Sequence, residues 1–134
     1  MNKKFILGIA AAAAIAVGSL SASAEGFAKT NTYTPGMFND VPASEWYASS
    51  VSSSYELGFM KGTADGVFSP EGNMTVAEAI TIAARVHDAY NAKGTTFSQN
   101  GANWYDDYVK YAVDNGIIKA DAFDDYDRPV KRYE

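Results

Sequence analysis

The residues of this sequence with catalytic potential are its carboxylates and one histidine. Acyl transfer needs a nucleophile with a base and an orienting partner, but His87 is the only histidine and follows no Gly-x-Ser-x-Gly element. Glycoside hydrolysis needs only two carboxylates, and the 16 Asp and Glu residues leave that chemistry open. They fall in expected loops and helix caps without a large pocket-forming scaffold, so we expect a protein that is not an enzyme.

The spacing of these residues does not indicate a metal site either. Four aspartates lie between Asp121 and Asp127, yet this loop lacks the Gly at the sixth position and the Glu at the twelfth that an EF-hand requires. Cysteine is absent, which excludes disulfides and thiolate ligands, and His87 has no second histidine with which to hold zinc. We expect neither a metal nor another cofactor.

Two tryptophans, Trp46 and Trp104, offer flat faces that can stack on a sugar ring. Each also stands at the start of an apolar helical stripe, where a buried tryptophan is the more common arrangement. We favour the core for both, with sugar binding as the alternative. Tyr105, Tyr108 and Tyr111 follow at three-residue spacing and indicate core positions whose hydroxyls reach water.

The two tryptophans belong to a block that occurs twice. The pattern Trp-Tyr-(x)3-Val-(x)6-Gly-(x)2-Lys starts at Trp46 and again at Trp104, with matched positions 58 residues apart. Residues 74–78 (MTVAE) match residues 130–134 (VKRYE), which lie 56 residues later. The second connecting loop is therefore two residues shorter than the first. Such a repeat indicates two copies of one unit that share a core and leave loops free for recognition, which favours a binding function.

Each unit is expected to contain two helices joined by a loop. Apolar spacing over residues 46–59 predicts a first helix that ends at Gly58, and a glycine-rich loop follows over residues 61–73. The capping box 75–78 (TVAE) then begins a second helix that ends near Gly94, with Val76, Ile80, Ala83, His87 and Tyr90 on its apolar stripe. In the second copy a helix follows Trp104, and residues 130–134 should begin another where the sequence stops. We favour a fragment of a longer polypeptide over a degenerate copy.

The first residues have the pattern of a secretory signal peptide. Lys3 and Lys4 precede an uncharged apolar run over residues 5–17, and residues 22–24 (ASA) provide a cleavage site. The run is shorter than the ~20 apolar residues of a membrane span, so we expect cleavage after Ala24 and no membrane anchor. Residues 25–37 are polar, carry a Pro-Gly turn and are expected to form a mobile leader.

The charge balance limits the possible partners. The chain has 11 basic and 16 acidic residues, and removal of the signal peptide leaves nine basic residues, a net charge of −7. Nucleic acid and anionic membranes bind through clustered Lys and Arg, which this sequence lacks. We therefore expect neither as a partner.

The order of several residues resembles a known family. Phe38-x-Asp40-Val41, Trp46, Val51, Gly58, Gly62, Gly66, Phe68-x-Pro70 and Thr75-x-Ala77-Glu78 follow the S-layer homology (SLH) motif. The resemblance covers residues 38–86 well and residues 104–134 in part. It implies an all-α fold of tandem helix-loop-helix SLH repeats, the second incomplete. The expected organisation is a signal peptide (1–24), a leader (25–37), a first repeat (38–94) and a truncated second repeat (95–134).

The resemblance also implies a function. SLH proteins are secreted bacterial proteins held non-covalently to the cell wall through a secondary wall polysaccharide that often carries pyruvate ketals. SLH modules usually come in threes, with one helix of each in a central bundle and the glycan in the grooves between modules. The alternative is a structural S-layer or envelope assembly protein that acts through homo-oligomerisation. The implied partners are the polysaccharide and further SLH repeats or copies of the chain itself, at the cell wall.

The family pattern Thr-Arg-Ala-Glu supplies an arginine for the acidic sugar. Arginine suits this role because its planar fork holds a carboxylate through two N–H groups, here near a helix N-terminus. The first copy has Val76 at that position, which fits a core residue, and the second has Arg132, which fits either a ligand or a solvated charge. The candidate glycan-binding residues are Arg132, Asp40, Trp46, Trp104, Glu78 and Glu134.

Three of these candidates also have a simpler explanation. Glu78 and Glu134 each occupy the position from which a carboxylate caps a helix start, a role that needs no ligand. Asp40 can cap the turn before Trp46, while the resemblance leaves it as an acceptor for sugar hydroxyls.

Overall fold

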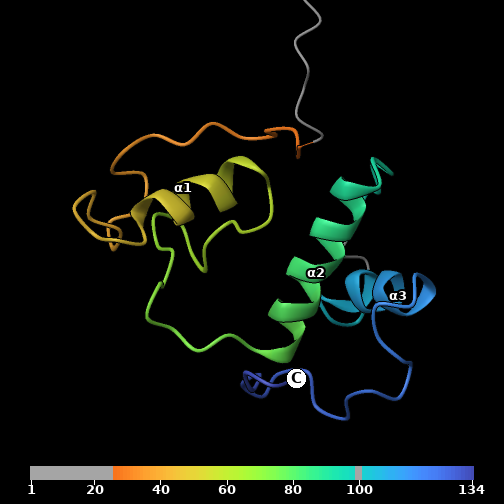
Figure 1. Ribbon diagram of the computed structural model, residues 1–134. Coiled ribbons are helices and arrows are strands. Elements are labelled where there is room, and N and C mark those ends of the chain that lie inside the picture. The colour runs from red at the N-terminus through yellow and green to blue at the C-terminus, as the bar shows by residue number, and fades with distance from the viewer. Residues whose placement is uncertain (1–25, 99–100) are drawn as a thin grey trace, which may run out of the picture.

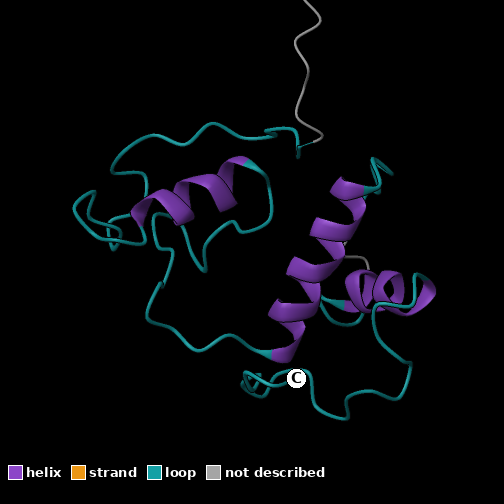
Figure 2. Cartoon of the chain, in the orientation of Figure 1, coloured by secondary structure: helices purple, strands orange, loops and turns teal. Residues whose placement is uncertain are grey.

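The computed structural model describes residues 26–98 and 101–134. Within these ranges three helices follow one another: α1 (Ala48–Glu56), α2 (Val76–Tyr90) and α3 (Asp106–Asp114) (Figure 1). No strand occurs within these ranges, and the only β pairings are isolated bridges, Ala64 with Val67 and Thr75 with Pro129 (Figure 2). The expectation of an all-α protein is confirmed for the described residues. The expected signal peptide and its cleavage site lie outside them, and none of the three helices is long and apolar enough to cross a membrane.

Helix α1 is the centre of the first unit. It begins after Tyr47, two residues later than the pattern predicted, and Gly58 lies just beyond its C-cap with φ +74°. Val51 is its buried residue and packs in a cluster with Phe38, Val41 and Phe68. Phe38 anchors this cluster through edge contacts with Phe68 (centroids 5.2 Å apart) and with Tyr55 (5.6 Å).

The stretch before α1 packs against the first unit. The backbone N–H groups of Thr30 and Asn31 donate to the Glu56 carbonyl at 2.7 and 3.0 Å, and Tyr33 packs on the cluster around Phe38. A β-carbon at position 58 would lie 2.6 Å from the Thr30 hydroxyl, so this approach needs Gly58. We expected a mobile leader over residues 25–37, and the described part of this stretch makes these contacts with the first unit.

Helix α2 begins at the predicted capping box. The Glu78 N–H donates to Thr75 Oγ1 at 3.2 Å, and the Thr75 N–H donates to Glu78 Oε2 at 2.7 Å. Val76 and Ile80 of the predicted stripe are buried, whereas Tyr90 is 78% exposed. The assignment of Tyr90 to the apolar stripe is therefore wrong, because it is the last helical residue and its ring reaches only Phe27, at a centroid distance of 6.4 Å.

Helix α3 packs on α2 and forms the rest of the core (Figure 1). Tyr108 and Tyr111 are buried, as expected. Their hydroxyls do not point to water as predicted but contact α2: Arg85 donates to Tyr108 at 2.9 Å, and His87 Nδ1 lies 3.0 Å from the Tyr111 oxygen. Burial in the contact with α2 explains the difference, because a buried hydroxyl requires a partner there.

The two copies of the repeated block have the same local geometry. Helices α1 and α3 have nine residues each, and Tyr47 and Tyr105 are their N-caps in αR conformation without a side-chain cap. Each tryptophan contacts the following tyrosine edge-on, at 5.6 Å in the first copy and 5.5 Å in the second. The similarity covers the start and the length of these two helices.

The second copy differs at its end. Residues 131–134 form a turn, not the start of a helix, yet the Lys131 N–H donates to Glu134 Oε2 at 2.9 Å, as that of Thr75 does to Glu78. Lys131 has no hydroxyl to complete the box, and so short a segment does not hold a helix without further turns. The N–H groups of Val76 and Ala77 at the start of α2 donate to carbonyls of residues 128 and 126 of this segment.

Candidate functional site

A cavity of about 300 Å³ lies between the two copies. The loops of the first unit (residues 59–63 and 68–74) form one side, α2 forms the second, and Trp104 of the second copy forms the third. Its charged and hydroxyl-bearing lining residues are Lys61, Thr63, Ser69, Glu78, Thr81 and Arg85. The volume is within the range of small-ligand sites, about 300–1,000 Å³.

Helix α2 presents a polar stripe to this cavity. Glu78, Thr81 and Arg85 are spaced i, i+3 and i+7, which places them on one face of the helix. Thr81 is 4% exposed, and its hydroxyl oxygen has no hydrogen-bond partner among the described residues. The stripe therefore carries an anion, an unpaired hydroxyl and a cation on the wall of one cavity.

Arg85 is a cation that has no counterion among the residues described by the structure. Its guanidinium donates to the Phe59 carbonyl at 3.1 Å and to the Tyr108 hydroxyl at 2.9 Å, and it lies over the Tyr108 ring at 5.1 Å. The ion pairs formed within the described ranges involve Lys29, Lys110 and Arg128, and none reaches Arg85. Two neutral acceptors thus fix the orientation of the guanidinium and leave its charge uncompensated by a carboxylate.

The other charged residues of the cavity are Lys61 and Glu78. Lys61 is exposed and makes no ion pair within the part of the chain that the structure describes. Glu78 Oε2 accepts from both the backbone N–H and the hydroxyl of Thr75, at 2.7 and 3.2 Å, which keeps its carboxylate in the helix cap. The lining carries two cations and one anion, in a protein whose formal net charge is −5.

Asp40 fixes the loop of the cavity but does not line it. Its carboxylate accepts from the Phe68 N–H at 2.9 Å and from the Ser69 N–H at 2.6 Å. The bond from Phe68 is the main cause that lowers the pKa of Asp40 below its ordinary value. The structure thus places this candidate as a loop clamp and not as the cap of the turn before Trp46.

The two tryptophans differ in exposure. Trp46 is 86% exposed and Trp104 is 43% exposed, so the core positions that we favoured are wrong for both. Each ring lies against its neighbouring tyrosine at the helix start instead of beneath the helix. Trp104 lines the cavity, whereas Trp46 does not.

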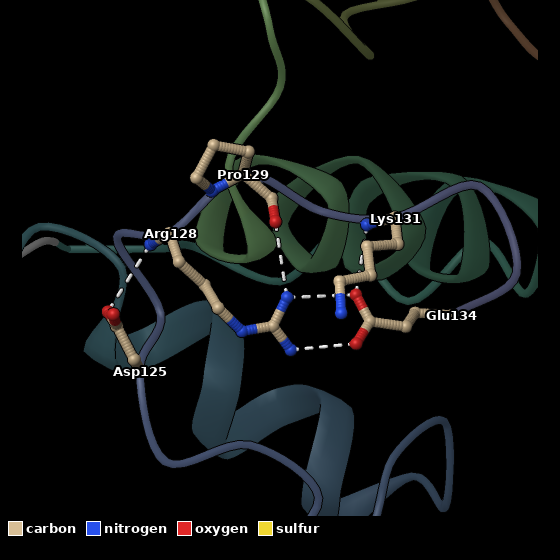
Figure 3. Close-up of polar contacts among 5 residues, drawn as sticks. All are labelled: Asp125, Arg128, Pro129, Lys131 and Glu134. Atoms are coloured by element: carbon tan, nitrogen blue, oxygen red, sulfur yellow. Dashed lines mark hydrogen bonds and ion pairs between the residues drawn. The ribbon is translucent and has the colours of Figure 1, made fainter.

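The candidates near the end of the sequence lie away from the cavity. Arg132 is exposed and makes no hydrogen bond or ion pair within residues 101–134 or with the first unit. Glu134 is held by Arg128 through two parallel bonds of 2.9 and 2.8 Å and by the Lys131 N–H (Figure 3). These bonds lower the pKa of Glu134 to about 2, and the bond from Arg128 has the largest effect.

At the position of the family's arginine in the first copy, Val76 is 1% exposed and packs in the core with Ile80 and Ala112. The cation of this unit comes instead from Arg85, which lies nine residues further along the same helix. Sequence reasoning missed Arg85, Thr81 and Lys61. A signal for the first two was present, because Glu78, Thr81 and Arg85 are polar residues at helical spacing and every other residue from 76 to 86 is apolar.

The acidic loop shows no arrangement for a metal ion. Within residues 26–98 and 101–134, no three His, Asp or Glu side chains are grouped to hold one. Asp125 accepts instead from the N–H groups of Asp127 and Arg128, at 2.9 and 3.3 Å.

Part of this chain is similar to known proteins. Residues 38–80 match the S-layer homology domain. The chain is 32% identical over 84 residues to the S-layer protein sap of Bacillus anthracis, and 31% identical over 84 residues to an S-layer protein of Bacillus thuringiensis subsp. finitimus. Each alignment covers 61% of this chain and 10% of the relative, so the chain spans about a tenth of the length of these curated relatives. No solved structure matches the chain significantly.

Proposed function

Because residues 38–80 match the S-layer homology domain, we propose that the chain is a non-catalytic module that anchors a secreted protein to the bacterial cell wall. The bound partner is an anionic wall polysaccharide, and its acidic groups are carboxylates such as pyruvate ketals. The site is the cavity between the first unit and Trp104 of the second copy. The observation that carries this proposal is Arg85, a partly buried guanidinium on the cavity wall without a carboxylate partner among the described residues.

The geometry of Arg85 suits a carboxylate. Arginine has five N–H donors, and the Phe59 carbonyl and the Tyr108 hydroxyl use two of them. The remaining donors can meet a carboxylate, and the side chain is already held in place, so less conformational entropy is lost on binding. Lys61 adds a second positive charge at the rim of the cavity.

Trp104 provides the aromatic surface for the sugar ring. It is partly exposed and lines the cavity from the second copy, so a ring bound beside Arg85 contacts both repeats. In this proposal Glu78 stays a helix cap at the cavity wall, Asp40 and Glu134 hold their loops, and Arg132 is a solvated charge.

The test is co-sedimentation of the purified protein with bacterial cell walls. We expect binding to intact walls and its loss after the polysaccharide, or its pyruvate alone, has been removed. Arg85→Gln should weaken binding by about tenfold or more, since a charge-assisted hydrogen bond contributes about 1.5–3 kcal/mol. Arg132→Gln removes the same charge away from the cavity and should have no effect. Equal binding to stripped and intact walls would reject the proposal.

A second candidate function is assembly of copies of this chain. The observation in its favour is Trp46, which has the same local geometry as Trp104 but is 86% exposed and does not line the cavity. A groove of another copy could cover it as the first unit partly covers Trp104. Light scattering after size exclusion distinguishes the two functions, because assembly requires a trimer or larger species that Trp46→Ala disrupts. A clean monomer at all concentrations excludes it.

A further inference from the structure

A second cavity, of about 420 Å³, adjoins the first one. It lies within the first unit, between the loop of residues 61–66 and the side chains of Phe38 and Tyr55. Three consecutive residues, Lys61, Gly62 and Thr63, line both cavities. This short segment is therefore a common wall, with Arg85 on one side and Tyr55 on the other.

The common wall is held in a fixed conformation. The Thr63 N–H donates to the Val67 carbonyl at 2.9 Å, and the Asn39 N–H donates to the Gly66 carbonyl at 2.8 Å. Gly62 has φ +87°, and a β-carbon on it would lie 2.5 Å from the Val67 carbonyl oxygen. The turn therefore requires glycine at its middle residue, and this close packing on Val67 fixes the wall between the two cavities.

The second cavity offers groups suited to neutral or acidic sugars. The Tyr55 hydroxyl and the side chains of Thr63 and Asp65 make no hydrogen bond within the described ranges, and Thr63 and Asp65 are exposed. They supply donors and acceptors for sugar hydroxyls. The partly exposed ring of Tyr55 contributes an aromatic surface, and Lys61 places a cation where the two cavities meet. This mixture of a few polar groups and an aromatic surface is typical of ligand sites.

We propose that the polysaccharide crosses Gly62 from the Arg85 cavity into this second cavity, so that the chain recognises at least two consecutive sugar units. The inference rests on the proposed function and deepens it. One unit places its carboxylate at Arg85, and the next places its hydroxyls at Tyr55 and Asp65. Lys61 lies between them and contacts the linkage region or a second acidic group.

The experiment compares fragments of the purified wall polysaccharide that contain one unit with fragments of two to four units. Binding to the intact protein is measured by calorimetry. We expect the longer fragments to bind about tenfold more tightly than the single unit, with one fragment per protein. A fragment of several identical units can bind a single site in several registers, which alone raises its apparent affinity by up to the number of units. The measured gain in affinity must therefore exceed that number.

Three variants separate the cavities. Asp65→Asn and the double variant Asp65→Asn with Tyr55→Phe should remove most of the gain and leave the affinity for the single unit unchanged. Arg85→Gln should weaken both fragment classes by the same factor. Asp65 is exposed and makes no hydrogen bond or ion pair among the described residues, so Asp65→Asn remains a valid test if the double variant unfolds.

Each outcome has a distinct meaning. Equal affinity for short and long fragments overturns the second subsite while the proposed function stands. A gain with length that Asp65→Asn leaves intact overturns it as well, because the added units then bind elsewhere. Failure of every fragment to bind the intact protein removes the proposed function and this inference together.

Discussion

Arg85 of α2 donates a hydrogen bond of 2.9 Å to the hydroxyl of Tyr108 in α3, and the same guanidinium lies over the Tyr108 ring. This contact joins the two copies of the repeat at the edge of the candidate site. It serves two purposes, because it satisfies a buried hydroxyl in the core and it orients the cation of the cavity.

The first prediction follows from that contact. Tyr108→Phe removes the hydroxyl and leaves one N–H of Arg85 without its partner. We expect the free energy of unfolding to fall by about 1–2 kcal/mol in urea titrations. Polysaccharide binding should weaken too, because Arg85 is no longer held in place. Tyr133→Phe, at a tyrosine that is 81% exposed, is the matched control and should change neither quantity. A variant with lower stability but normal binding would show that Tyr108 does not position Arg85.

The second prediction concerns the pair of Arg128 and Glu134. Its bonds lower the pKa of Glu134 from an ordinary value of 4.5 to about 2. A carboxyl whose pKa is lower in the folded state stabilises the fold above its unfolded pKa, and this contribution is lost as the pH falls through the folded pKa. Glu134→Gln should therefore have a lower Tm than the parent at pH 7.

The difference in Tm should narrow as the pH falls below 4.5 and vanish below pH 2, where both proteins carry a neutral side chain. Arg132→Gln, two residues away and without contacts among the described residues, should follow the parent at every pH. A constant difference across this range would show that the charge of Glu134 is not what stabilises the turn.

Much of the local structure could be predicted because it depends on neighbouring residues. The capping box of Thr75 and Glu78 uses groups three residues apart, and both expected helices that follow a tryptophan form. The burial of Val76 also follows from its place on a helical stripe. These features require little knowledge of how the units are arranged.

The candidate site was harder to predict because it is made by residues far apart in the sequence. Trp104 reaches the cavity only because α3 packs on α2, and Asp40 acts as a clamp only because the loop returns to it 28 residues later. The exposure of Trp46 depends likewise on what covers the start of α1, which a helical pattern does not specify. The distance of a residue along the sequence from a tryptophan or a capping box does not indicate these long-range contacts.

The third prediction concerns the unpaired hydroxyl of Thr81 in the cavity wall. Thr81→Val keeps the shape and removes a buried group that has no hydrogen bond among the described residues. We expect the free energy of unfolding to rise by about 1 kcal/mol, since the desolvation cost of an unpaired hydroxyl disappears. Thr32→Val, at an exposed threonine, should change it by less than about 0.5 kcal/mol. Destabilisation by Thr81→Val would mean that the hydroxyl has a partner in solution, such as an ordered water.

The fourth prediction uses the two tryptophans as internal probes of the two candidate functions. The variants Trp46→Phe and Trp104→Phe each retain a single tryptophan, and the remaining ring is 43% exposed in the first and 86% exposed in the second. Quenching by acrylamide should therefore be at least about twofold weaker for Trp104 than for Trp46 when no ligand is present, in proportion to these exposed fractions.

Wall polysaccharide should then protect one ring and not the other. If it binds the cavity, quenching of Trp104 falls further and its emission shifts to shorter wavelength, while Trp46 is unaffected. If copies of the chain assemble through Trp46, quenching of Trp46 falls with protein concentration even without polysaccharide. Protection of Trp46 alone by polysaccharide would contradict the site proposed here, because that ring does not line the cavity.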